Sequence, residues 1–67
     1  MKYLYVLVLD NGEYWNGNNS TPVLDKAKKY ISAQQALYVC DRIQKIVNSK
    51  YIEIKEYKDC VKKELYK

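Results

Sequence analysis

The sequence predicts a small α+β domain: a mostly antiparallel sheet, built from a hairpin and one or two further strands, with one main helix on one face. Three observations predict this two-layer ββ(β)αβ order. Residues 3–9 are apolar and lead into Asn11-Gly12, the strongest short-range hairpin signal. Residues 33–48 carry apolar side chains at helical spacing. Residues 51–57 alternate between apolar and polar, as a half-buried strand does.

The hairpin begins with a strand over residues 2–9, where valine and tyrosine favour extended backbone. Asn11 and Gly12 suit a two-residue type I′ turn, because both central residues of that turn need a positive φ. This turn fixes the predicted register of the second strand, which places Asp10 opposite Glu13, Leu9 opposite Tyr14 and Val8 opposite Trp15.

The middle of the chain is less regular. Residues 16–21 are polar and predict a loop. Thr21 and the residues after it are expected to be extended, because Thr21 precedes Pro22. Residues 25–29 fit either one helical turn or the lead into a third strand at residues 29–31, and we favour the strand.

The main helix is predicted from Ala33 to about Asn48. Ser32 can accept a hydrogen bond from the amide of Gln35, and Gln35 can reach back to Ser32, which makes a capping box. One apolar stripe follows at helical spacing and is expected to face the sheet: Ala36, Val39, Cys40, Ile43, Ile46 and Val47.

Strand alternation assigns side chains to the two faces of the sheet. The face under the helix gives the predicted core: Leu4, Val6, Val8, Trp15, Ile31, Ala36, Val39, Cys40, Ile43, Val47, Ile52 and Ile54. The other face carries Tyr3, Tyr5, Leu7, Leu9, Tyr14, Tyr51, Glu53, Lys55 and Tyr57. Only the tail could cover that face. Residues 58–67 are expected to form either a short helix with Asp59 as its N-cap or a frayed end.

This second face supports three alternatives. In the first, the tail folds over Leu7 and Leu9, and the tyrosines merely flank the strands. In the second, the face binds a protein, either a second copy of the chain or a foreign partner, because tyrosine supplies contact area at low entropic cost. In the third, the tyrosines stack nucleobases beside lysines. The candidate partner-binding residues are Tyr3, Tyr5, Tyr14, Tyr51, Lys55 and Tyr57, and the candidate nucleic-acid-binding residues are Lys28, Lys29, Lys50 and Lys55.

Composition narrows the function. The 67 residues are expected to form a single domain, residues 1–67, with little room for a deep cleft beside a core. The net charge of +4 is uneven, with −2 over residues 1–25 and +6 over residues 26–67. The basic second part of the chain could bind nucleic acid or an acidic protein, or it could simply form a solvated surface. No secretory signal and no apolar run of about 20 residues is present, so we expect a cytoplasmic protein without a membrane span.

Catalytic groups are scarce. The chain has no histidine, which removes the commonest general base, and its two glycines form no phosphate-binding motif. We therefore expect no enzyme activity, no metal and no other cofactor. Cys40 belongs to the apolar stripe of the helix. Cys60 in the tail is expected to be exposed, where Lys58, Lys62 and Lys63 would favour its thiolate.

Several local features occur together over residues 3–43: the tyrosine- and valine-rich first strand, Asn11-Gly12 with Tyr14, and Lys26-Ala27-Lys28-Lys29-Tyr30 before a capped helix containing Ala36. In this layout the chain resembles small accessory proteins of phages and prophages in low-GC bacteria, a group that includes anti-CRISPR inhibitors. The resemblance implies a non-catalytic protein in the host cytoplasm that binds and inhibits or modulates a bacterial defence complex, such as a CRISPR effector. Inhibitors that mimic DNA are strongly acidic, so the basic charge favours blocking of a protein surface or allosteric locking.

Overall fold

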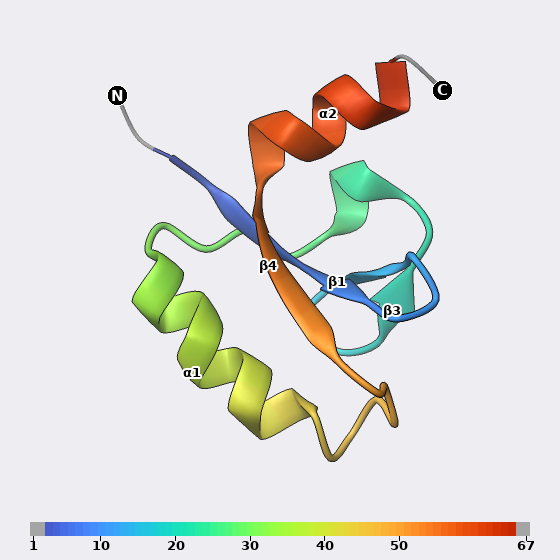
Figure 1. The fold of residues 1–67 in the computed structure, drawn as a ribbon, viewed down its shortest axis with the longest axis vertical. Coiled ribbons are helices and arrows are strands. Elements are labelled where there is room, and N and C mark those ends of the chain that lie inside the picture. Colours follow the sequence, from blue (N-terminus) through green and yellow to red (C-terminus); the bar gives the residue numbers. More distant parts are fainter. Residues whose placement is uncertain (1–2, 66–67) are drawn as a thin grey trace.

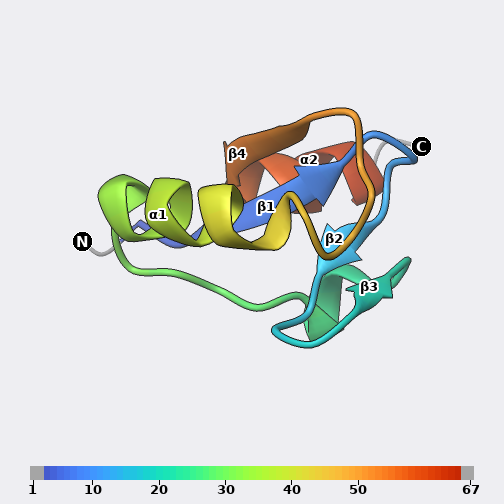
Figure 2. The ribbon, with the colours of Figure 1, turned by 90° about the horizontal axis from the view of Figure 1, so that it is seen from below.

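The computed structural model describes residues 3–65 of the chain and the side chains of residues 3–62. Its antiparallel sheet has four strands in the order β3-β2-β1-β4, and a helix lies on each side of the β1–β4 pair (Figures 1 and 2). The α+β class and the main helix on one face are as predicted, and the element order matches in outline. The elements are β1 (Tyr5–Leu9), β2 (Tyr14–Trp15), β3 (Ser20–Thr21), η1 (Leu24–Lys26, a 3₁₀ turn), α1 (Ala33–Ile43), β4 (Ile52–Glu56) and α2 (Tyr57–Leu65).

The central strand β1 is apolar on both of its faces. Successive side chains of a strand point to opposite sides, so Val6 and Leu7 face different layers, yet both are fully buried. Leu7 meets α1, whereas Val6 meets η1 and α2. Two covers are therefore needed, one for each face of this strand.

Most of the buried side chains form two clusters. The α1 cluster contains Leu7, Trp15, Tyr30, Ala36 and Ile43, with the half-buried Tyr5, Val39, Val47, Ile52 and Ile54 packed against them. The α2 cluster contains Val6, Tyr14, Leu24, Ala27 and Cys60, with the half-buried Val8, Tyr57 and Val61. The predicted core is therefore wrong for β1, because Val6 and Val8 lie on the face away from α1. The predicted core is also wrong for Ile31, whose side chain is exposed. The predicted apolar stripe of the helix is wrong for Ile46, which is exposed as well.

The register of the first hairpin differs from the prediction by one residue. Gly12 N donates to Leu9 O at 3.0 Å, and Leu9 N donates to Glu13 O at 2.8 Å, so the loop has three residues rather than two. Gly12 takes a φ of +86°, the left-handed conformation of a glycine that completes such a loop with a bulge. Val8 consequently lies opposite Tyr14 instead of Trp15. A shift of one residue exchanges the faces of the second strand, so Trp15 joins Leu7 and not Val8.

The segment between β2 and α1 fits the predictions only in part. The predicted loop contains the short strand β3, and the helical turn considered after it is η1. The third strand expected at residues 29–31 is reduced to a bridge in which Tyr30 and Tyr5 exchange both backbone hydrogen bonds at 2.8 Å. Lys28 N donates to Trp15 O at 2.8 Å, so this segment continues the sheet where β2 ends.

Helix α1 begins as predicted and ends earlier. Ser32 Oγ accepts a hydrogen bond from Gln35 N at 3.0 Å, which satisfies one of the free amides of the first turn. The helix ends at Ile43 rather than near Asn48. Asn48 has a φ of +52°, a left-handed conformation that redirects the chain toward β4.

Strand β4 alternates as predicted, and the tail forms a helix. Helix α2 starts at Tyr57, directly after the strand, so Asp59 lies within its first turn and is not its N-cap. The prediction of a short helix is confirmed up to Leu65, while residues 66–67 lie outside the described residues.

The double burial of β1 leads to a test of stability. Leu7→Ala is expected to lower the free energy of unfolding by about 2–5 kcal/mol, because a fully buried leucine leaves a cavity. Urea unfolding followed by circular dichroism measures the loss. Leu37→Ala, the same substitution at an exposed position of α1, is the control and should change stability by less than about 0.5 kcal/mol. Equal losses in the two variants would contradict the burial of Leu7.

Candidate protein-binding surface

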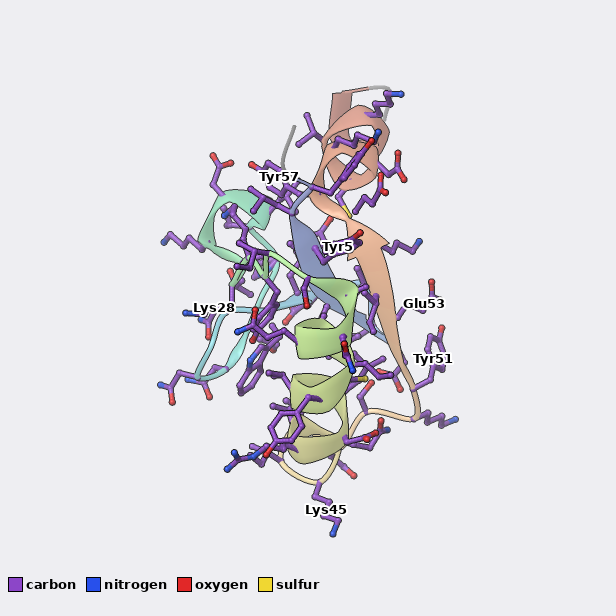
Figure 3. The ribbon with its side chains drawn as sticks, turned by 90° about the vertical axis from the view of Figure 1, so that its left-hand side faces the viewer. Tyr5, Lys28, Lys45, Tyr51, Glu53 and Tyr57 are labelled. Atoms are coloured by element: carbon purple, nitrogen blue, oxygen red, sulfur yellow. The ribbon has the colours of Figure 1, made fainter. Side chains whose placement is uncertain are left out.

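The tyrosines predicted to form one open sheet face do not share a face. Tyr5 lies in the α1 cluster, whereas Tyr14 and Tyr57 lie in the α2 cluster. Tyr3 and Tyr51 are about half exposed. Figure 3 shows Tyr5, Tyr51 and Tyr57 on separate parts of the molecule. The geometric premise of a single aromatic face is therefore wrong, because the strand registers place these tyrosines on both sides of the sheet.

The tail does cover one face of the sheet, but the alternative in which it folds over Leu7 and Leu9 is wrong, because Leu7 lies in the α1 cluster. Helix α2 covers Val6 and Val8 instead. Cys60, which was expected to be exposed, is buried in the α2 cluster. Both faces of β1 are therefore packed rather than open, and Cys60 is buried with Val6, Tyr14, Leu24 and Ala27.

Tyr57 anchors the start of α2 to η1. Its hydroxyl donates to Asp25 Oδ1 at 3.3 Å, and Lys29 Nζ lies 5.0 Å from the centre of its ring. Lys29 Nζ also donates to the carbonyl oxygens of Asp25 and Ala27, both at 3.0 Å. Burial and the nearby Asp25 carboxylate raise the pKa of Tyr57. These contacts give Tyr57 and Lys29 a role in holding the fold together.

The lysines predicted for nucleic-acid binding lie on separate elements. Lys29 is engaged with η1, and Lys55 Nζ lies 3.5 Å from Glu53 Oε2 on the same strand. Lys28 and Lys50 are exposed, the first after η1 and the second just before β4. Figure 3 places Lys28 on the opposite side of the molecule from Glu53. The structure thus distributes these lysines around the sheet.

Trp15 and Tyr30 make a polar contact inside the α1 cluster. The indole N–H of Trp15 donates to the hydroxyl of Tyr30. Burial raises the pKa of Tyr30, and this hydrogen bond lowers it by less. Burial, helped by the charge of Asp41, also raises the pKa of the Cys40 thiol, which packs on the sheet side of α1 as predicted.

The outer side of α1 exposes large apolar side chains. Leu37 is 55% exposed, Tyr38 62% and Ile46 68%. The guanidinium of Arg42 lies 5.9 Å from the centre of the Tyr38 ring, one turn further along the helix. Residues at i and i+4 lie on one ridge of a helix, as Tyr38 and Arg42 do, and Ile46 lies four residues further on, in the turn that follows α1. We call this set the α1 surface: Leu37, Tyr38, Arg42 and Ile46.

The sequence contains a signal for part of the α1 surface. Tyr38 and Arg42 lie off the predicted apolar stripe, and both are exposed. Leu37 also lies off this stripe. An apolar residue on the polar side of an amphipathic helix is unusual, and this makes Leu37 recognisable in the sequence. Ile46 was assigned to the stripe because the helix was expected to continue, whereas α1 ends at Ile43 and Ile46 lies in the turn that follows.

The described residues show no membrane span and no metal centre. No helix within residues 3–65 is both long enough and apolar enough to cross a membrane. Within the same part of the chain, no group of three or more histidine, cysteine, aspartate or glutamate side chains is placed to hold a metal ion. The sequence matches no protein-family model and no curated protein, and the fold matches no solved structure.

The buried Tyr30 hydroxyl predicts how stability depends on pH. In the folded chain the pKa of Tyr30 is raised above the ordinary value of about 10. The neutral hydroxyl therefore contributes its full share of the free energy of unfolding below about pH 10, and this share is lost as pH rises through the pKa of the folded state. We expect the wild type to lose stability more steeply above about pH 10 than Tyr30→Phe, which has no proton to lose. Urea midpoints of both proteins at a series of alkaline pH values measure this difference. Parallel curves would show that Tyr30 ionises as freely in the folded chain as in the unfolded one.

Proposed function

We propose that this protein is a small non-catalytic binding protein that attaches to another protein through the α1 surface. The observation that carries the proposal is the exposure of Leu37 and Tyr38 on α1, with Arg42 over the Tyr38 ring and the exposed Ile46 in the turn that follows the helix. Contiguous exposed apolar groups rimmed by polar residues are typical of interaction sites. Tyrosine and arginine are also the residue types that most often dominate binding energy.

The α1 surface fits a partner with an apolar groove or patch beside a carboxylate. A helix that binds in this way presents side chains spaced by three or four residues, as Tyr38 and Arg42 are, and the turn after the helix adds Ile46. Gln34, Asp41 and Lys45 form the exposed polar surroundings. Arg42 already stacks on Tyr38, so less side-chain freedom is lost when both become buried in a complex.

For the target, we propose a bacterial defence complex that the protein inhibits or modulates. The resemblance of residues 3–43 to small phage accessory proteins, including anti-CRISPR inhibitors, supports this class of partner. A net charge of +4 argues against imitation of DNA and favours blocking of a protein surface or allosteric locking. The helix surface replaces the sheet face that the sequence suggested as the binding region.

Substitutions on the α1 surface test this proposal. Tyr38→Ala and Arg42→Ala are each expected to weaken partner binding at least about thirtyfold, the effect of losing an interface hot spot. Lys26→Ala, at an exposed position of η1 on the other face of the sheet, is the control and should bind as the wild type does. Affinity is measured on a partner captured from nuclease-treated host lysate with the tagged protein. Circular dichroism verifies that all three variants fold.

Retention of the partner by the two surface variants would refute the α1 surface as the binding site. Loss of every partner on nuclease treatment, with an affinity for nucleic acid that falls steeply with salt, would instead support nucleic-acid binding by the lysines. If the captured partner is a defence nuclease, its activity should fall in proportion to added protein and stop near one molecule per complex.

A further inference from the structure

Strand β4 is an edge strand with one free side. The strand order places it at the end of the sheet, and no strand within residues 3–65 pairs with its outer side. In Figure 3, β4 forms the right-hand border of the molecule, where Tyr51 and Glu53 project away from α1. A free edge is a template for pairing with another strand.

The hydrogen-bond pattern shows which backbone groups face this edge. Tyr57 N donates to Leu4 O at 2.7 Å, and antiparallel pairs alternate between bonded and non-bonded positions. Lys55 and Glu53, opposite Val6 and Val8, therefore direct their backbone groups toward β1. The groups that face outward are the N–H and C=O of Ile52 and Ile54 and the N–H of Glu56, whose carbonyl begins α2.

The other side of β1 supports the same alternation. Leu9 and Tyr5 make their backbone bonds with Glu13 and Tyr30, so the odd residues of β1 face away from β4 and the even ones face it. In agreement, Ile52 O contacts Cys40 Sγ at 3.8 Å, which leaves a lone pair for a further donor.

We propose that the partner of this edge is a second copy of the chain, paired antiparallel β4 to β4 about a two-fold axis at Ile54. In this register, Ile54 exchanges both backbone bonds with Ile54 of the partner subunit. Glu56 N donates to Ile52 O of the partner subunit, and the symmetric bond forms on the other side. The outward-facing backbone N–H and C=O groups of one β4 thus meet those of the other without any change in the conformation of the strand.

The order of charges along β4 selects this register. Glu53 lies opposite Lys55 of the partner subunit at a non-bonded position, where opposing side chains approach most closely. Both side chains are solvent-accessible, Glu53 to 52% and Lys55 to 39%, and they lie 3.5 Å apart on their own strand, so the cross-strand pairs would extend this ion pair into a network of four charges. The two neighbouring registers with the same backbone match place Glu53 against Glu53 of the partner subunit, or Lys55 against Lys55 of the partner subunit. Like charges directly opposite each other disfavour both of them.

The apolar face of β4 adds to the complementarity. Ile52 and Ile54 face α1 but remain half-buried at the open edge, so a second strand there would remove further apolar surface from water. Opposed residues of paired strands share a face, and the two copies of α1 would therefore lie on the same side of one continuous sheet. This dimer pairs strand edges and does not depend on meeting tyrosine faces.

Sedimentation velocity over a concentration series reaching about 1 mM tests the dimer. The wild type should shift from monomer to dimer as concentration rises. Glu53→Lys and Lys55→Glu should each weaken self-association about tenfold, because two attractive cross-strand pairs become repulsive. Lys62→Glu makes the charge change of Lys55→Glu at an exposed position of α2 and should dimerise like the wild type.

The decisive sample is an equimolar mixture of the Glu53→Lys and Lys55→Glu variants. In a mixed dimer, every cross-strand pair at these positions has opposite charges, so native mass spectrometry should show the mixed dimer in preference to either homodimer. A wild type that stays monomeric throughout the series would overturn the proposal. Unchanged self-association of both single variants, or a mixture without preference, would overturn it as well. Both substituted side chains are solvent-accessible, so the variants are expected to fold, and circular dichroism checks this.

Discussion

The burial of β1 on both faces is the constraint on which the rest of the structure depends. Val6 and Leu7 are neighbours in the chain and point to opposite sides, yet both are fully buried. A single helix covers only one face of a sheet, so η1 and α2 provide the second cover. Several aromatic side chains are consequently used for packing, including Tyr14 and Tyr57, which would otherwise be available to a partner.

Local sequence signals predicted the helices and strands well. Which face of the sheet each side chain occupies depends on the pairing register of the strands. The Ser32 cap, the start of α1 and the alternation of β4 follow from nearby residues, and the structure has all three. Asn11-Gly12 indicated a hairpin correctly but suits both two-residue and three-residue loops. Because β1 is apolar on both faces, its pattern does not choose between the two registers. A single residue in the loop therefore moved Trp15 to the other side of the sheet.

The candidate site was less predictable than the fold, because exposure depends on what covers each element. Nothing in the sequence near Tyr14 shows that η1 and α2 pack beside it. Leu37, by contrast, stands out in the sequence itself, since it interrupts the polar side of an amphipathic helix. The α1 surface and the edge of β4 are among the parts that remain exposed. A β4-paired dimer would present two α1 surfaces on one side, which would strengthen binding to a target with repeated sites.

The most direct measurement for this account is a nuclear Overhauser experiment on methyl-labelled protein, because it reports which helix each β1 side chain contacts. Leu7 methyl protons should show cross-peaks to Ala36 and Ile43 of α1, and Val6 methyl protons should show them to Cys60 of α2. Cross-peaks from Val6 to Ala36, or from Leu7 to Cys60, would contradict the two-sided core and the register of the sheet.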